Sequence, residues 1–178
     1  IMTQKVVPKI KVIISLTKEF IFLIILLLLF FIVMNAWGHL ENLKLWAGAL
    51  MLFSLAKIYF LVSHTFKKLD TLIEDNHSFN HMLLLLGAII TIIVISFAID
   101  YLCVTEIYPN AFSGIQNSQP LLSRFLNLLY FSIVTFTTVG YGDIIPIAPV
   151  SKFITVIEMM SGFIVIVFII SKYFKNNN

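Results

Sequence analysis

The sequence predicts an all-α membrane protein with four transmembrane helices and one shorter helix that enters the membrane and returns to the same side as a loop. Two observations predict this fold class. The 178 residues are 60% hydrophobic and only 12% charged, with a mean hydropathy of +1.00. The charges are also clustered, so that apolar runs of about twenty residues recur between them. The net charge of +3 is not gathered into basic blocks with aromatic residues, which argues against a nucleic-acid partner.

Four apolar segments are expected to cross the lipid bilayer. The first contains no charge and is too long for the apolar part of a cleaved signal peptide, so we expect it to be a retained helix. The second and third each contain one charged residue, Lys57 and Asp100, and the fourth contains Glu158 in its first third and Lys172 near its end. The four expected spans are 20–37, 45–63, 82–104 and 153–174.

Between the last two spans, a polar stretch at 105–119 precedes an apolar run at 121–136. This run is too short for a further span plus a loop, and it suits a helix that reaches halfway into the membrane, with Ser123 as its N-cap. Irregular backbone at that depth must be enclosed by protein, so we expect other copies of the chain to surround it. The resulting domains are a cytoplasmic or interfacial segment (1–19), two peripheral helices (20–63), a cytoplasmic linker (64–81) and a pore domain (82–178).

The distribution of Lys and Arg predicts the orientation. Eight of these residues fall on one side of the expected membrane and three on the other: Lys5, Lys9, Lys11, Lys18, Lys67, Lys68, Lys172 and Lys175 against Lys44, Arg124 and Lys152. Positive charge favours the cytoplasmic side. We therefore expect a multi-pass protein of the cell membrane with both termini in the cytoplasm.

The motif Thr-Thr-Val-Gly-Tyr-Gly-Asp at 137–143 follows the short apolar run. Glycine at alternate positions tolerates the backbone angles needed to turn successive carbonyl oxygens to one side. Four such strands around an axis would form stacked rings of oxygen atoms, which can replace the hydration shell of a potassium ion.

The sequence Tyr-Phe-Ser-Ile-Val-Thr-Phe at 130–136, followed by this motif, resembles the pore helix and selectivity filter of tetrameric potassium channels. The resemblance covers about 82–174. It implies a homotetramer in the lipid bilayer that binds K⁺ as its permeant ion and needs no other cofactor. It also implies that the backbone carbonyls of Thr138, Val139, Gly140 and Tyr141 bind potassium, and that Gly142 and Asp143 form the outer mouth of the filter.

Residues behind the filter are expected to hold its diameter, although lipid-facing aromatic residues are the alternative interpretation. The candidates are Tyr130, Phe131, Val134, Phe136 and Thr137. Some family members carry an acidic residue at the position of Val134, which pairs with the aspartate after the filter. Asp143 lacks that partner here.

The last span contains the candidates for a gate. Gly162 is either a hinge or a site of close helix packing, and the two interpretations stay open. Gly162, Ile166, Ile170 and Phe174 share one helical stripe at i, i+4 spacing. If this stripe faces the axis, Ile170 or Phe174 would form a hydrophobic constriction.

The first two spans contain Lys57 and no arginine, so steep voltage gating is not expected. We expect Lys57 to extend to the cytoplasmic surface. Glu158 is expected to be hydrogen-bonded to Ser132 or Thr135, or protonated, in either a structural or a functional role.

The sequence therefore predicts a potassium channel that conducts passively. Two alternatives are a subunit of a potassium uptake system and a regulatory membrane subunit that no longer conducts. The sequence contains no nucleophile–base pair and no phosphate-binding loop, so an enzyme is not expected.

Overall fold

The computed structural model describes residues 21, 25, 27–29, 31–33, 43–74 and 79–176, and within these ranges it omits the side chains of 43, 61–62, 64–74, 79–85 and 168–176. Its helices are α2 (Leu43–Glu74), α3 (Phe79–Ile107), α4 (Leu121–Phe136) and α5 (Pro149–Asn176). Most of the first expected span lies outside the described residues. Those that are described within it are helical.

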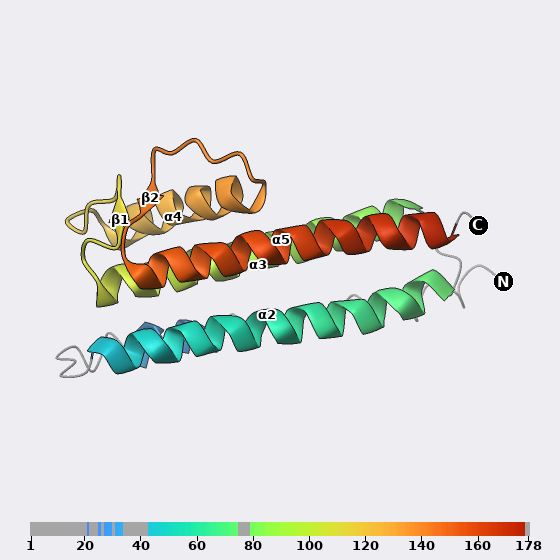
Figure 1. Ribbon diagram of the computed structural model, residues 1–178, viewed down its shortest axis with the longest axis horizontal. Helices are drawn as coiled ribbons and strands as arrows, with labels where there is room; N and C mark the ends of the chain where they lie inside the picture. The colour runs from blue at the N-terminus through green and yellow to red at the C-terminus, as the bar shows by residue number, and fades with distance from the viewer. Residues whose placement is uncertain are drawn as a thin grey trace.

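Three long helices, α2, α3 and α5, run side by side, and the short helix α4 lies at one end of this bundle (Figure 1). Helix α4 packs on α3 and α5, and α2 packs on the opposite side of the same two helices. The chain leaves α4 near the middle of the bundle and returns along it to β2. The chain thus turns back after α4, as expected from the sequence, and the entry of this loop into a membrane stays a prediction.

In the part of the chain that is described, two helical segments are long and apolar enough to cross a membrane, namely Leu86–Ile107 and Pro149–Val167. They correspond to the third and fourth expected spans. Helix α2 extends to Glu74 instead of ending at residue 63, so 64–74 of the expected linker is helical. The physical reason is that polar residues can continue a helix after its apolar part ends.

Helix α4 has the bounds expected from the sequence, but its N-cap is Pro120 rather than Ser123. Pro120 has φ −54° and ψ 146° and makes no side-chain capping hydrogen bond. Its fixed φ and missing N–H suit the position just before a helix. Ser123 already lies within the first turn, where it cannot act as the N-cap.

A two-stranded antiparallel sheet joins the α3–α4 loop to the segment that precedes α5. Strand β1 (Phe112–Ser113) pairs with β2 (Ile145–Pro146), with Phe112 opposite Pro146 and Ser113 opposite Ile145. The sequence analysis did not predict these strands. The pairing holds the exit of the 137–143 segment beside the start of α4.

Candidate functional site

The backbone of 137–143 folds back onto the end of α4. The N–H groups of Val139 and Gly140 both donate to the carbonyl oxygen of Val134, at 3.0 and 3.4 Å. The N–H and C=O of a trans peptide unit point in opposite directions, and the described residues contain no cis bond. The carbonyl oxygens of Thr138 and Val139, which belong to those peptide units, therefore point away from α4.

Alternate residues of the segment have a left-handed backbone. The φ angles are 58° at Thr138, 59° at Gly140 and 78° at Gly142. When right-handed and left-handed backbone conformations alternate, successive N–H groups point to one side and carbonyl groups to the other. The two glycines were expected to have this role. Thr138 was not, and among the described residues it is the one non-glycine with positive φ.

All seven residues of the motif are exposed in the single chain, including Val139 at 53% and Tyr141 at 71%. A Cβ atom added to Gly140 or Gly142 would meet nothing within 4 Å. Backbone conformation, and not lack of space, is therefore what these positions require of glycine. The exposed face is available to other chains.

The residues expected behind the filter fall into two groups. Phe131, Val134 and Phe136 are buried. Tyr130 is partly exposed and stacks on Tyr141, with ring centroids 6.5 Å apart and an interplanar angle of 1°. Thr137 is exposed, and its hydroxyl donates to the Ile133 carbonyl at 2.7 Å.

Three aromatic rings pack together where α3, β1 and α4 meet. The ring centroids of Tyr101 and Phe131 lie 5.1 Å apart, and Phe112 lies 5.4 Å from each of them. All three pairs have edge-to-face geometry, which adds to the stabilisation from burial. This cluster fixes the position of α4.

The far end of the motif is fixed by the α3–α4 loop. Gly114 has φ +87°, and a Cβ atom there would lie 2.3 Å from the carbonyl oxygen of Asp143. The carboxylate of Asp143 accepts a hydrogen bond from the N–H of Ile144 at 3.1 Å.

The carbonyl oxygen of Ala111 links the same loop to the chain after β2. It accepts hydrogen bonds from Ile147 N (2.8 Å), Ala148 N (3.2 Å) and Ser151 Oγ (2.9 Å).

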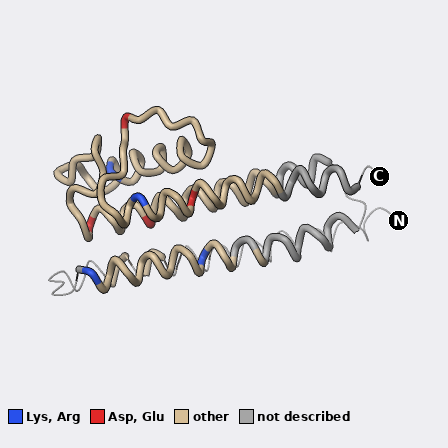
Figure 2. The backbone as a smooth tube through the Cα atoms, in the orientation of Figure 1, with Lys and Arg blue, Asp and Glu red and all other residues tan. Residues whose placement is uncertain are grey.

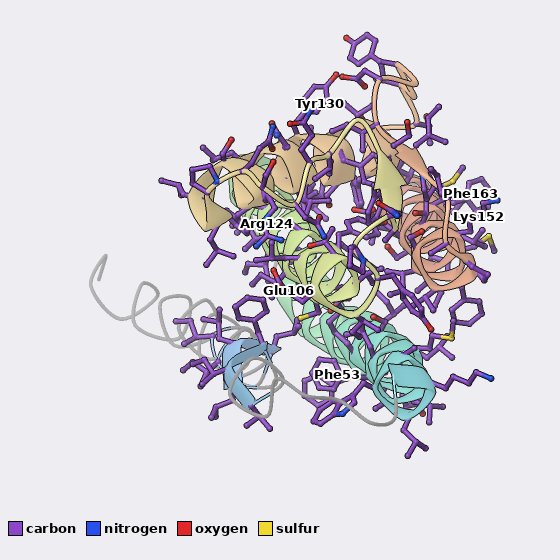
Figure 3. The ribbon with its side chains drawn as sticks, turned by 90° about the vertical axis from the view of Figure 1, so that its left-hand side faces the viewer. Phe53, Glu106, Arg124, Tyr130, Lys152 and Phe163 are labelled. Carbon is purple, nitrogen blue, oxygen red and sulfur yellow. The ribbon has the colours of Figure 1, made fainter. Side chains whose placement is uncertain are left out.

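An ion pair joins the end of α3 to the start of α4. Arg124 Nη2 lies 2.6 Å from Glu106 Oε1, and both side chains are partly exposed (Figure 3). A partly exposed pair of this kind adds little to stability.

Glu158 on α5 is fully buried beside α4. It accepts a hydrogen bond from Tyr101 Oη at 2.5 Å and contacts the hydroxyl of Ser132. The expected contact with Ser132 is confirmed. Tyr101 was not predicted as a partner, because nothing in the sequence shows which face of α3 meets α5.

The expectation for Lys57 was wrong. Its ammonium group does not reach the surface but is buried in an ion pair with Asp100 on α3, and it lies 4.2 Å from the centre of the Phe97 ring. Ser54 Oγ also donates to Asp100, at 2.7 Å. A nearby carboxylate provides a counter-ion within the protein, so the side chain need not extend to water. Charged residues are sparse on the coloured part of the helices in Figure 2.

Gly162 is buried and packs closely against the end of α4. A Cβ atom there would lie 3.1 Å from the carbonyl oxygen of Phe136. This contact matches the close-packing interpretation, and the hinge stays a prediction. Ile166 is 47% exposed, while the side chains of Ile170 and Phe174 lie outside the described part of α5.

In the described part of the chain, a short helix and the loop that follows it pack against α3 and α5, the two helices that contain segments long and apolar enough to cross a membrane. Residues 84–176, just over half of the chain, match a family model described as "Ion channel". The chain belongs to this ion channel family, which is not a class of enzymes.

Several curated proteins are similar to the chain. Two-pore potassium channel 4 of Arabidopsis thaliana is 30% identical over 51% of this chain and 29% of its own length. Voltage-gated potassium channel Kch of Escherichia coli (strain K12) is 28% identical over 74% of this chain and 33% of its own length. The chain thus spans about a third of the length of these relatives. No solved structure matches it significantly.

Proposed function

We propose that the protein is a potassium-selective channel that conducts K⁺ passively across the cell membrane. The observation that carries the proposal is the backbone of 137–143, in which the carbonyls of Thr138 and Val139 point away from α4 and positive φ alternates. The names of the relatives, which are potassium channels, support the choice of ion.

In the proposed mechanism, the carbonyl oxygens of Thr138, Val139, Gly140 and Tyr141 replace the water around a dehydrated K⁺ ion. The hydroxyl of Thr138 adds a ligand at the inner end, and Gly142 with Asp143 forms the outer mouth. The carboxyl end of α4 carries partial negative charge, which favours a cation near the inner end of the filter.

A complete ring of ligands needs four copies of the motif, and the sequence contains one. We therefore propose a homotetramer. Exposed apolar side chains on α4 and α5 support it, because these helices flank the exposed motif: Leu122, Leu126, Ile133, Phe153, Val156, Phe163 and Ile166. Closed fourfold symmetry would cover these side chains together with the filter.

The arrangement in the membrane is proposed from the apolar segments and from the distribution of Lys and Arg along the sequence. Four helices cross the bilayer, both termini are cytoplasmic, and the motif faces the outside. The first two expected spans contain Lys57 and no arginine, so voltage changes open probability only weakly. Gly162, Ile166, Ile170 and Phe174 are the proposed hinge and gate.

Ion flux from the purified protein in liposomes tests the proposal. We expect uptake of K⁺ but little uptake of Na⁺, with block by Ba²⁺. A subunit of an uptake system would need partner proteins for transport, and a regulatory subunit would conduct nothing. Absence of flux under a K⁺ gradient would therefore overturn the channel proposal.

A further inference from the structure

A buried chain of polar groups links three helices directly behind the candidate filter. The carboxyl group of Glu158, on α5, lies between Tyr101 of α3 and Ser132 of α4. The hydroxyl of Ser132 also lies 2.9 Å from the carbonyl oxygen of Val94, on α3. Ser132 and Glu158 are fully buried.

The number of hydrogen atoms available to these polar groups decides which group donates each hydrogen bond. Ser132 has one hydroxyl hydrogen, but its oxygen lies within hydrogen-bonding distance of two acceptors, Glu158 and Val94 O. If Glu158 were an ionised carboxylate, one of these contacts would bring two oxygen atoms together without a hydrogen between them. If Glu158 is a neutral acid, it donates to Ser132 Oγ, Ser132 donates to Val94 O, and Tyr101 donates to the other carboxyl oxygen. Every buried contact is then a hydrogen bond.

The charges around Glu158 lead to the same assignment. Among the residues whose side chains are described, the charged groups that act on it are Lys57 and Asp100. These two form an ion pair with each other. An ionised Glu158 would therefore be a buried charge without a counter-ion of its own, which is strongly unfavourable inside a protein.

We propose that Glu158 is a positioning residue, held as a neutral carboxylic acid, that ties α4 to α3 and α5 and so maintains the filter. Ser132 lies two residues before Val134, whose carbonyl oxygen holds the N–H groups of Val139 and Gly140. A shift of α4 at Ser132 moves that carbonyl and with it the filter backbone. Val134 has no carboxyl group, so the acid behind this filter comes from the inner helix.

Two substitutions at Glu158 separate a neutral acid from other roles in the full-length protein. In E158Q, the amide NH₂ donates to Ser132 and the amide oxygen accepts from Tyr101, so the K⁺/Na⁺ permeability ratio in bilayers should equal that of the wild type. In E158L, both hydroxyls lose their partner, and the ratio should fall roughly fivefold to tenfold, as expected from the loss of buried hydrogen bonds. The matched control is S161A, because Ser161 is a buried hydroxyl of α5 that donates to the Glu158 carbonyl within its own helix at 2.7 Å. It should keep the ratio.

Two results would overturn the proposal: an E158Q channel as unselective as E158L, or an E158L channel with the wild-type ratio. If E158L does not assemble, S132A and Y101F replace it, since each removes one hydrogen bond of the chain. The wild-type ratio in both variants would contradict the positioning role.

The measurements of the permeability ratio rest on the proposed channel function, but an infrared experiment does not. The wild-type protein in lipid should show the C=O stretching band of a protonated carboxyl group, and this band should be absent from E158Q and present in S161A. Equal spectra for wild type and E158Q would overturn the neutral acid even if the protein conducted no potassium. Failure of flux in the wild type, with the band present, would overturn only the proposed function.

Discussion

Single residues set the geometry of the candidate filter. The requirement for glycine at Gly114 has a different cause from the requirement for glycine at Gly140 and Gly142. At Gly140 and Gly142 a side chain would meet open space, so the left-handed backbone alone is the constraint. At Gly114 a side chain would also collide with the Asp143 carbonyl. The α3–α4 loop therefore supports the filter exit through a direct backbone contact.

We predict that G114A lowers both the thermal stability and the K⁺ flux of the protein. The substitution adds left-handed strain of about 1–3 kcal/mol and forces the Asp143 carbonyl to move. The matched control is G48A, because Gly48 lies in α2, has open space around it and lacks a positive φ. Alanine there should be neutral or stabilising by up to about 1 kcal/mol. Thermal unfolding and liposome flux measure both effects, and a G114A protein that matches G48A would contradict the role of the loop.

At the residue scale, the contact of Glu158 with Ser132 was one of the alternatives predicted from the sequence, and the structure confirms it. Lys57 was misplaced because its partner, Asp100, lies on another helix, and only packing reveals which faces meet. The positive φ of Thr138 was missed because no glycine marks it.

At the scale of elements, the ion pair between Lys57 and Asp100 docks the peripheral helix α2 on the pore domain. We predict that K57M or D100N alone destabilises the protein by about 3–5 kcal/mol, because each leaves a buried charge or polar group without its partner. The double variant K57M/D100L should be less destabilised than either single one. K44M is the matched control, since Lys44 is an exposed lysine at the start of α2.

Denaturant unfolding of these variants in detergent micelles measures the coupling. Single variants that unfold like K44M would show that the pair does not hold α2. Additive effects in the double variant would show that the two side chains act independently.

Element boundaries were predictable where a strong local signal marks them. Helix α4 begins after Pro120 and ends at Phe136, where the glycine motif follows, and both signals are visible in the sequence. The end of α2 was not visible, because the residues after 63 leave the apolar pattern but still permit a helix. Strands β1 and β2 contain two residues each, too few for a periodic pattern.

At the scale of the whole molecule, the proposed assembly makes potassium a ligand of the tetramer and not of the single chain. A ligand that binds only the assembled state stabilises that state, by about 2.7 kcal/mol when its concentration is 100 times its dissociation constant. We therefore predict that the tetramer dissociates at a higher temperature in K⁺ than in Na⁺ at equal ionic strength. Size-exclusion chromatography after heating measures the fraction that remains assembled.

The variant G140A separates ion binding from general salt effects in this experiment. Alanine at φ +59° strains the filter backbone without any clash, so the potassium-dependent part of the stabilisation should shrink. The control G87A lies in α3 with open space around it and should keep the full difference between K⁺ and Na⁺. Equal dissociation temperatures in the two salts for the wild type would contradict a potassium site shared between chains, and a stable dimer would contradict the fourfold assembly.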